Sequence, residues 1–77
     1  MLVLKSKQVI KYIDSQDKPT KERLTIALNN LPNGDVVPIV GLNNTFRLRI
    51  GNFRAVFVKE CDIIKVTFIN SRGQVYK

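Results

Sequence analysis

Three arginines, Arg47, Arg49 and Arg54, fall within one stretch of eight residues and are the side chains whose type and spacing point most directly to chemistry. Guanidinium groups stay protonated in proteins and bind phosphate oxygens through paired hydrogen bonds. Gathered in one place, they would hold a nucleic-acid backbone or stabilise the negative charge that develops when a phosphate reacts. Either role requires a structural element that brings all three together.

The alternation of residue types around these arginines predicts a β-hairpin. Apolar and cationic residues alternate along 45–50, a Gly-Asn pair follows at 51–52, and the alternation then resumes. A two-residue loop with Gly first suits a type II′ turn, in which Arg49 faces Arg54 and the third arginine shares their face. Like charges placed opposite each other destabilise a sheet, which favours a site for a polyanion. The plainer alternative for the first two arginines is a solvated edge of an amphipathic strand.

The composition of the chain also favours an acidic partner. Its 77 residues include 13 Lys and Arg but 6 Asp and Glu, for a net charge of +7, and residues 41–77 carry seven basic and two acidic side chains. Nucleic acid, an acidic protein and an anionic membrane are the candidate partners, with a general solubility bias as the alternative. The absence of His and the lone Cys61 argue against a metal site or an internal disulfide, so we expect neither metal nor cofactor.

Two amphipathic helices are predicted in the N-terminal half. The first begins after Ser6 and ends near 15–16, and the second begins after Asp17, because Ser and Asp are favoured helix caps. Residues 32–44 are rich in Pro, Gly and Asn and are predicted to form a loop with a short extended piece at 36–37.

Three later strands are predicted at 45–50, 53–58 and 62–69, with a turn at 60–61, and a short β-prone run at 2–4 precedes the helices. One face of the sheet is expected to pack against the helices and to contain Phe46, Leu48, Ile50, Phe53, Ala55, Phe57, Ile64, Val66 and Phe68. The other face is expected to contain Arg47, Arg49, Arg54, Val56, Val58, Ile63, Lys65, Thr67 and Ile69. Bare apolar residues on that second face indicate a partner surface.

We therefore expect residues 1–77 to form a single α+β domain in the order β-α-α-β-β-β. Two N-terminal helices would pack on one face of a mostly antiparallel sheet. The apolar start is too short for a signal peptide or a membrane span, so we expect a cytoplasmic protein.

Two segments resemble the RelE/ParE superfamily of bacterial toxins: the hairpin at 46–57 and the closing sequence Arg72-Gly-Gln-Val-Tyr76-Lys77. The late β-run, the Leu31-Pro32 loop before Gly41 and the expected order of elements fit the same resemblance, which covers nearly all of the chain. The hairpin is more specific for the superfamily than for a branch within it. The fold that the resemblance implies is RelE-like.

For the RelE branch, the resemblance implies a metal-independent endoribonuclease that cleaves mRNA in the ribosomal A site. It assigns catalytic roles to basic residues on the first central strand, an arginine opening the next strand, an arginine after the last strand and a tyrosine near the C-terminus. In this chain these are Arg47, Arg49, Arg54, Arg72 and Tyr76. The implied partners are an acidic antitoxin protein and mRNA on the ribosome, without a membrane or small-molecule cofactor.

Cleavage by the substrate's own 2′-hydroxyl needs a base for that hydroxyl, cations for the phosphate charge and an acid for the leaving 5′-oxygen. The arginines supply cations. Because the chain has no His, Tyr76 is the candidate for proton transfer beside Lys65 and Lys77, and these two lysines are also expected to bind RNA. Many RelE-like proteins continue into a C-terminal helix after the tyrosine, whereas this sequence ends at Lys77 and we expect no such helix.

Two other functions fit the same residues. A ParE-like toxin would poison DNA gyrase by binding and would cut no RNA, while a non-enzymatic RNA-binding module or an inactive toxin would keep the cationic face without chemistry. We favour the nuclease because Arg54, Arg72 and Tyr76 occur together with the strand arginines. A purely binding role gives no reason for the tyrosine.

Overall fold

Two helices and five strands make up the computed structural model, which describes residues 2–71. The elements are β1 (Leu2–Lys5), α1 (Lys7–Asp14), α2 (Lys18–Asn29), β2 (Asp35–Pro38), β3 (Thr45–Ile50), β4 (Phe53–Glu60) and β5 (Ile63–Ser71). Within the described residues, neither helix has the length and apolar character needed to cross a membrane.

Each helix begins where the sequence provides a capping side chain. Ser6 Oγ accepts a hydrogen bond from the N–H of Val9 at 3.2 Å, and Asp17 Oδ1 accepts one from the N–H of Thr20 at 3.1 Å. The hydrogen bonds from Thr20, its side chain first and its backbone second, lower the pKa of Asp17. Both predicted helix starts are confirmed, because these caps satisfy N–H groups that a helix leaves free in its first turn.

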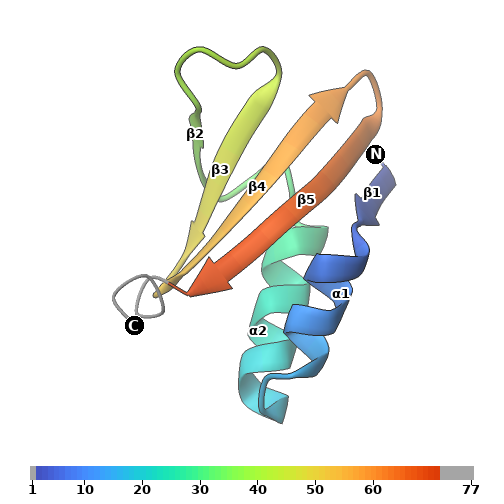
Figure 1. Cartoon of the computed structure of the whole chain (residues 1–77), viewed down its shortest axis with the longest axis vertical. Coiled ribbons are helices and arrows are strands. Elements are labelled where there is room, and N and C mark those ends of the chain that lie inside the picture. The colour runs from blue at the N-terminus through green and yellow to red at the C-terminus, as the bar shows by residue number, and fades with distance from the viewer. Residues whose placement is uncertain (1, 72–77) are drawn as a thin grey trace.

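The strands form one sheet in the spatial order β1-β5-β4-β3-β2. β1 runs parallel to β5, and every other neighbouring pair is antiparallel. Figure 1 shows the two helices side by side, away from the β2–β3 edge. The α+β class and the mostly antiparallel sheet are confirmed, and β2 is an added strand in the segment 32–44 that the sequence predicted to be mainly loop.

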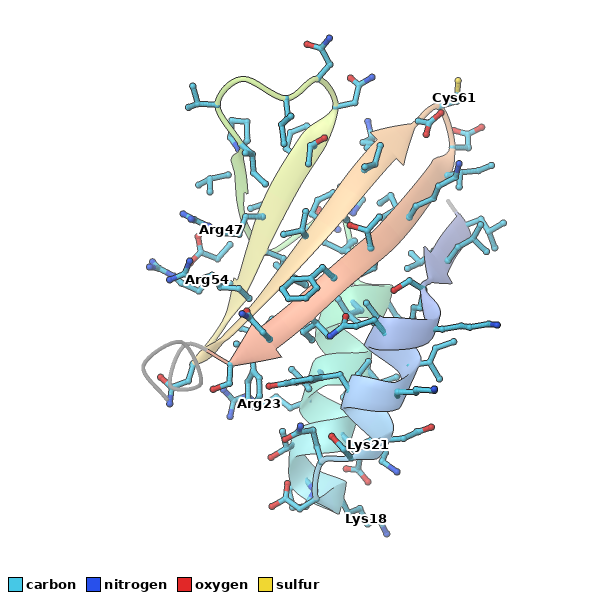
Figure 2. All side chains as sticks on the ribbon, in the orientation of Figure 1. Lys18, Lys21, Arg23, Arg47, Arg54 and Cys61 are labelled. Carbon is cyan, nitrogen blue, oxygen red and sulfur yellow. The ribbon has the colours of Figure 1, made fainter. Side chains whose placement is uncertain are left out.

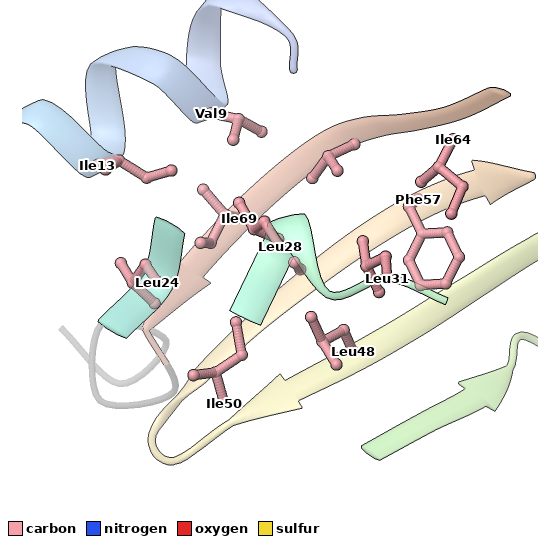
Figure 3. Packing of buried hydrophobic residues seen from close by; sticks show 12 residues of the cluster. Val9, Ile13, Leu24, Leu28, Leu31, Leu48, Ile50, Phe57, Ile64 and Ile69 are labelled. Atoms are coloured by element: carbon pink, nitrogen blue, oxygen red, sulfur yellow. The ribbon is translucent and has the colours of Figure 1, made fainter. Parts of the chain in front are cut away.

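The core lies between the helices and one face of the sheet, which we call the inner face. Figure 3 shows the side chains of both helices directed at the strands. The buried residues are Val9, Ile13, Leu24, Leu28, Leu31, Leu48, Ile50, Ala55, Phe57, Ile64, Val66 and Ile69. Phe46 packs against this cluster, and its ring stacks on that of Phe57 with centroids 5.4 Å apart. The opposite side of the sheet is the outer face.

A β-bulge in β5 corrects the predicted pattern of that strand. Phe57 lies opposite Val66, but Val56 lies opposite Phe68, so Thr67 is an extra residue with no direct partner. Beyond an extra residue, inward and outward positions exchange places. Phe68, predicted to lie in the core, is therefore 44% exposed, and Ile69, predicted to lie on the outer face, is completely buried.

The second hairpin turn also differs by one residue from the prediction. Glu60 lies opposite Ile63, so the two-residue loop is Cys61-Asp62 rather than 60–61. β4 therefore extends to Glu60 and β5 begins at Ile63 instead of 62, while at its other end β5 also continues past the predicted end to Ser71.

Candidate functional site

The β3–β4 hairpin brings the three arginines to the outer face as predicted. Arg49 lies directly opposite Arg54, and Arg47 lies opposite Val56. The backbone φ of Gly51 is +57°, whereas that of Asn52 is not positive, and this combination matches a type II′ turn. Figure 2 shows the labelled Arg47 and Arg54 side chains extending to the same side of this hairpin.

One carboxylate reaches this arginine cluster, which comprises Arg47, Arg49 and Arg54. Asp35 on β2 lies opposite Arg49, and its Oδ2 accepts a hydrogen bond from Arg49 Nε at 3.1 Å. Both side chains are more than half exposed, so the pair contributes about 1 kcal/mol or less. Within residues 2–71, Arg47 and Arg54 have no carboxylate within ion-pair distance. Their charges are available to a ligand.

Arg23 approaches the same hairpin from α2. Its guanidinium packs against the backbone of Gly51, so closely that a Cβ at that position would collide with it. Figure 2 places the labelled Arg23 near the end of β5, beside the hairpin tip. The sequence did not identify Arg23 as a contact of the hairpin, because helical spacing gives no information about which strand end a long side chain reaches.

Lys65 lies on the outer face but away from the arginine cluster. It is opposite Val58, four residues along β4 from Arg54, a separation of about 13 Å at the usual rise of a strand. Its Nζ forms an ion pair with Glu60 at 3.5 Å. The register therefore brings Arg47, Arg49 and Arg54 together and leaves Lys65 near the opposite end of the strands.

The remaining predicted site residues, Arg72, Tyr76 and Lys77, lie outside the residues that the structure describes. The last described residue before them is Ser71, whose backbone forms a hydrogen bond with Tyr12 of α1. Burial raises the pKa of Tyr12, and this hydrogen bond opposes the rise. The Tyr12 ring also meets Phe53 edge to face, with centroids 6.2 Å apart. The sequence did not identify Tyr12 as a residue that fixes the end of β5.

Apolar side chains occupy much of the rest of the outer face. Val37 lies opposite Arg47, and Val56 and Phe68 also lie beside the arginine cluster, whereas Leu2, Leu4, Val58 and Ile63 lie toward the other end of β5. No three His, Cys, Asp or Glu side chains within residues 2–71 gather in a way that could hold a metal ion. The described outer face can thus bind a ligand that offers negative charge and apolar surface together.

Solved structures show which fold this is. A chain in the crystal structure of the RelB–RelE antitoxin–toxin complex from Methanococcus jannaschii matches with a TM-score of 0.75 and 22% identity, over 95% of this chain and 94% of that one. A chain in the archaeal RelE–RelB complex from Pyrococcus horikoshii OT3 matches with a TM-score of 0.76 and 23% identity, over 95% of this chain and 96% of that one. No protein-family model and no curated protein sequence matches. The RelE-like fold predicted from the sequence is confirmed.

Proposed function

We propose that this protein is the toxin of a toxin–antitoxin pair and that it inhibits translation by cleaving mRNA on the ribosome. The observation that supports this most strongly is the arginine cluster on a sheet face that no helix or strand of residues 2–71 covers, in a RelE-like fold. Two of its members, Arg47 and Arg54, have no carboxylate partner within the described chain. A pair of unneutralised guanidinium groups on a solvent-facing surface fits a phosphate ligand.

The arginines would serve the reaction by charge rather than by proton transfer. Guanidinium does not act as a base in proteins, so Arg47, Arg49 and Arg54 would bind the phosphate groups on either side of the cut and stabilise the extra negative charge of the transition state. We propose that Arg72 adds a fourth cation and that Tyr76 transfers a proton. The 2′-hydroxyl of the substrate would be the nucleophile, so the reaction needs no metal.

The partner we propose is an acidic antitoxin protein. The matching solved structures are antitoxin–toxin complexes, and this chain carries a net charge of +7 with exposed apolar side chains beside its cations. An acidic segment with an apolar side would complement that surface, and its affinity would fall as salt rises.

The test is Arg54→Ala in a cell-free translation system, with cuts in the message mapped by primer extension. We expect wild-type protein to produce cuts phased to the codons, and Arg54→Ala to cut about 10²- to 10³-fold more slowly, as when one charge-stabilising donor is removed. Lys18→Ala is the matched control, because it removes one exposed cation at the far end of the helices (Figure 2) and should leave the rate unchanged.

The same samples should be run in a DNA gyrase supercoiling assay. Cutting by Arg54→Ala at the wild-type rate would show that the arginine cluster is not the active surface. Wild-type protein that blocks supercoiling and cuts no message would overturn the nuclease in favour of the gyrase-poisoning alternative. Tyr76→Phe tests the proposed proton transfer separately, since it should slow cutting without weakening association with the ribosome.

A further inference from the structure

The bulge in β5 turns one aromatic ring out of the core and onto the outer face. With regular pairing, Phe68 would point inward, but the extra residue Thr67 reverses the pattern and leaves Phe68 44% exposed. Exposing this much of a Phe ring forgoes burial that would stabilise the fold by about 1 kcal/mol or more. Bulges often re-aim a side chain next to a functional site.

Hydrogen bonds from the start of α1 fix the bulge in this form. Ser6 Oγ donates to the carbonyl of Thr67 at 3.0 Å. The side-chain amide of Gln8 donates to the carbonyl of Ile69 at 2.9 Å and accepts from its N–H at 3.1 Å. The residues on both sides of Phe68 are thus held through their backbones, while the ring itself stays uncovered. The backbone bonds of Thr67 and Ile69 therefore fix the position from which Phe68 points to the outer face.

The ring lies within reach of the arginine cluster. Phe68 is opposite Val56, which is in turn opposite Arg47 on the next strand. Arg54 is opposite Asn70, so it is a diagonal neighbour of Phe68, at about 7–8 Å between Cα atoms. One face therefore presents an exposed aromatic ring with Arg54 as its diagonal neighbour and Arg47 beyond Val56, and within the described chain neither guanidinium has a carboxylate partner.

We propose that Phe68 is a stacking platform for an unpaired base of single-stranded RNA whose phosphates are bound by Arg47 and Arg54. Aromatic rings beside a cationic track are the means by which proteins bind single strands, because every base offers a flat face to stack on. This inference rests on the proposed function and adds a residue that positions the substrate.

An RNA base suits this ring better than an apolar protein segment does. Leu2 and Leu4, exposed on the β1 edge of the sheet, lie opposite Ile63 and Lys65, near the far end of β5, and Val37, exposed on the β2 edge, lies opposite Arg47. β1 ends its pairing at Val66, so Phe68 lies beyond it, on the side of the arginine cluster. Arg54 is its diagonal neighbour and Arg47 lies beyond Val56, so two cations on the same face can bind the phosphates next to a base stacked on the ring.

The experiment is equilibrium binding of two fluorescent probes by fluorescence anisotropy: a six-nucleotide oligoadenylate and the same ribose-phosphate chain without bases. We expect wild-type protein to bind the oligoadenylate about 5- to 100-fold more tightly than the base-free chain, as stacking of one base on an aromatic ring requires. Phe68→Ala should abolish that difference and leave the affinity for the base-free chain unchanged. Phe68→Trp, which keeps an aromatic ring at this position, should retain the tighter binding of the oligoadenylate.

Ile10→Ala is the matched control, because Ile10 on α1 is as exposed as Phe68, at 47%, and should leave both affinities unchanged. Equal binding of the two probes by wild-type protein, or an undiminished preference in Phe68→Ala, would overturn the stacking role. An unchanged preference together with lost antitoxin binding would assign Phe68 to the protein partner instead. Cutting on ribosomes is measured separately, so codon-phased cuts without base preference would refute only the platform, and base preference without cuts would refute only the nuclease.

Discussion

The two faces of β4 and β5 belong to the same strands but are under different physical constraints. Toward the helices, these strands present buried apolar side chains, namely Ala55, Phe57, Ile64, Val66 and Ile69. Toward solvent, they present half-buried or exposed side chains, namely Arg54, Val56, Val58, Ile63, Lys65 and Phe68. No helix or strand of the described chain covers that second set. One pleated pair of strands thus carries both the core and the candidate site.

The inner positions therefore specify the fold, whereas the outer positions carry the candidate site. An inner position must fill a defined volume, so its residue is constrained by packing. An outer position is free of that constraint and can accept an arrangement that is locally unfavourable, such as Arg49 opposite Arg54. The arginine cluster is therefore an addition to a scaffold whose stability comes from the other side of the same strands.

Adjacent residues of β4 give the largest test of this comparison. Phe57 is 1% exposed and stacks on Phe46, whereas its neighbour Val56 is half-buried on the outer face. We expect Phe57→Ala to lower the free energy of unfolding by about 3–5 kcal/mol, because it leaves a cavity in the core. Val56→Ala should lower it by about 1 kcal/mol or less.

Urea denaturation followed by circular dichroism measures both variants. Similar losses for Phe57→Ala and Val56→Ala would mean that the outer face contributes to stability as the core does, and the division between the faces would be wrong. Because Phe57→Ala removes much of the stability of a small domain, its urea curve should be fitted with m, the slope of unfolding free energy against urea concentration, fixed at the wild-type value.

The next test breaks the link between the two faces at the bulge. Gln8→Ala removes the side-chain amide that bonds to both backbone groups of Ile69, at 2.9 and 3.1 Å. We expect a loss of about 2 kcal/mol in unfolding free energy, since two partly buried backbone groups lose their partner. Amide hydrogen exchange at Ile69, measured by NMR, should become faster.

Gln16→Ala is the matched control for Gln8→Ala. The Gln16 amide bonds only within its own helix end, to the carbonyl of Tyr12 and the hydroxyl of Ser15, both at 3.2 Å. We expect no change in exchange at Ile69. If exchange at Ile69 stays at the wild-type rate in Gln8→Ala, the bulge is held by β5 itself rather than by α1.

The sequence predicts the local elements well, because their signals lie close together in the chain. The caps Ser6 and Asp17 mark the two helix starts, and alternation around the Gly-Asn pair sets the register that places Arg49 opposite Arg54. Each of these features depends on residues within a few positions of one another. The resemblance in the hairpin and the tail then identified the RelE-like fold.

The features that the sequence did not predict depend on residues far apart in the chain. The bulge at Thr67 is held by Gln8 and Ser6, about 60 residues earlier, and no alternation within β5 shows where an extra residue falls. The bond between Asp35 and Arg49 needs β2, whose sequence contains a proline and resembles a loop. The signal that could have found this pair is the carboxylate of Asp35 at a position that faces Arg49 once β2 pairs with β3.

The smallest test concerns the two turns that set the registers of both faces. Gly51 and Cys61 occupy the first loop positions of the two hairpins and have φ values of +57° and +52°. A side chain in this region of backbone conformation costs about 1–2 kcal/mol, and Gly avoids that cost. Because part of the gain is offset by the greater freedom of Gly in the unfolded chain, Cys61→Gly should stabilise the protein by about 1 kcal/mol, raising its Tm by about 4–8 °C.

Gly51→Ala should shift the Tm in the opposite direction, since it introduces a Cβ at positive φ against the Arg23 guanidinium. Thermal unfolding under reducing conditions measures both variants, and a Cys61→Gly protein that unfolds below the wild-type Tm would show that the Cys61 turn is not strained. Neither substitution changes a side chain on the inner or outer face, so message cutting by Cys61→Gly should stay at the wild-type rate while its stability rises.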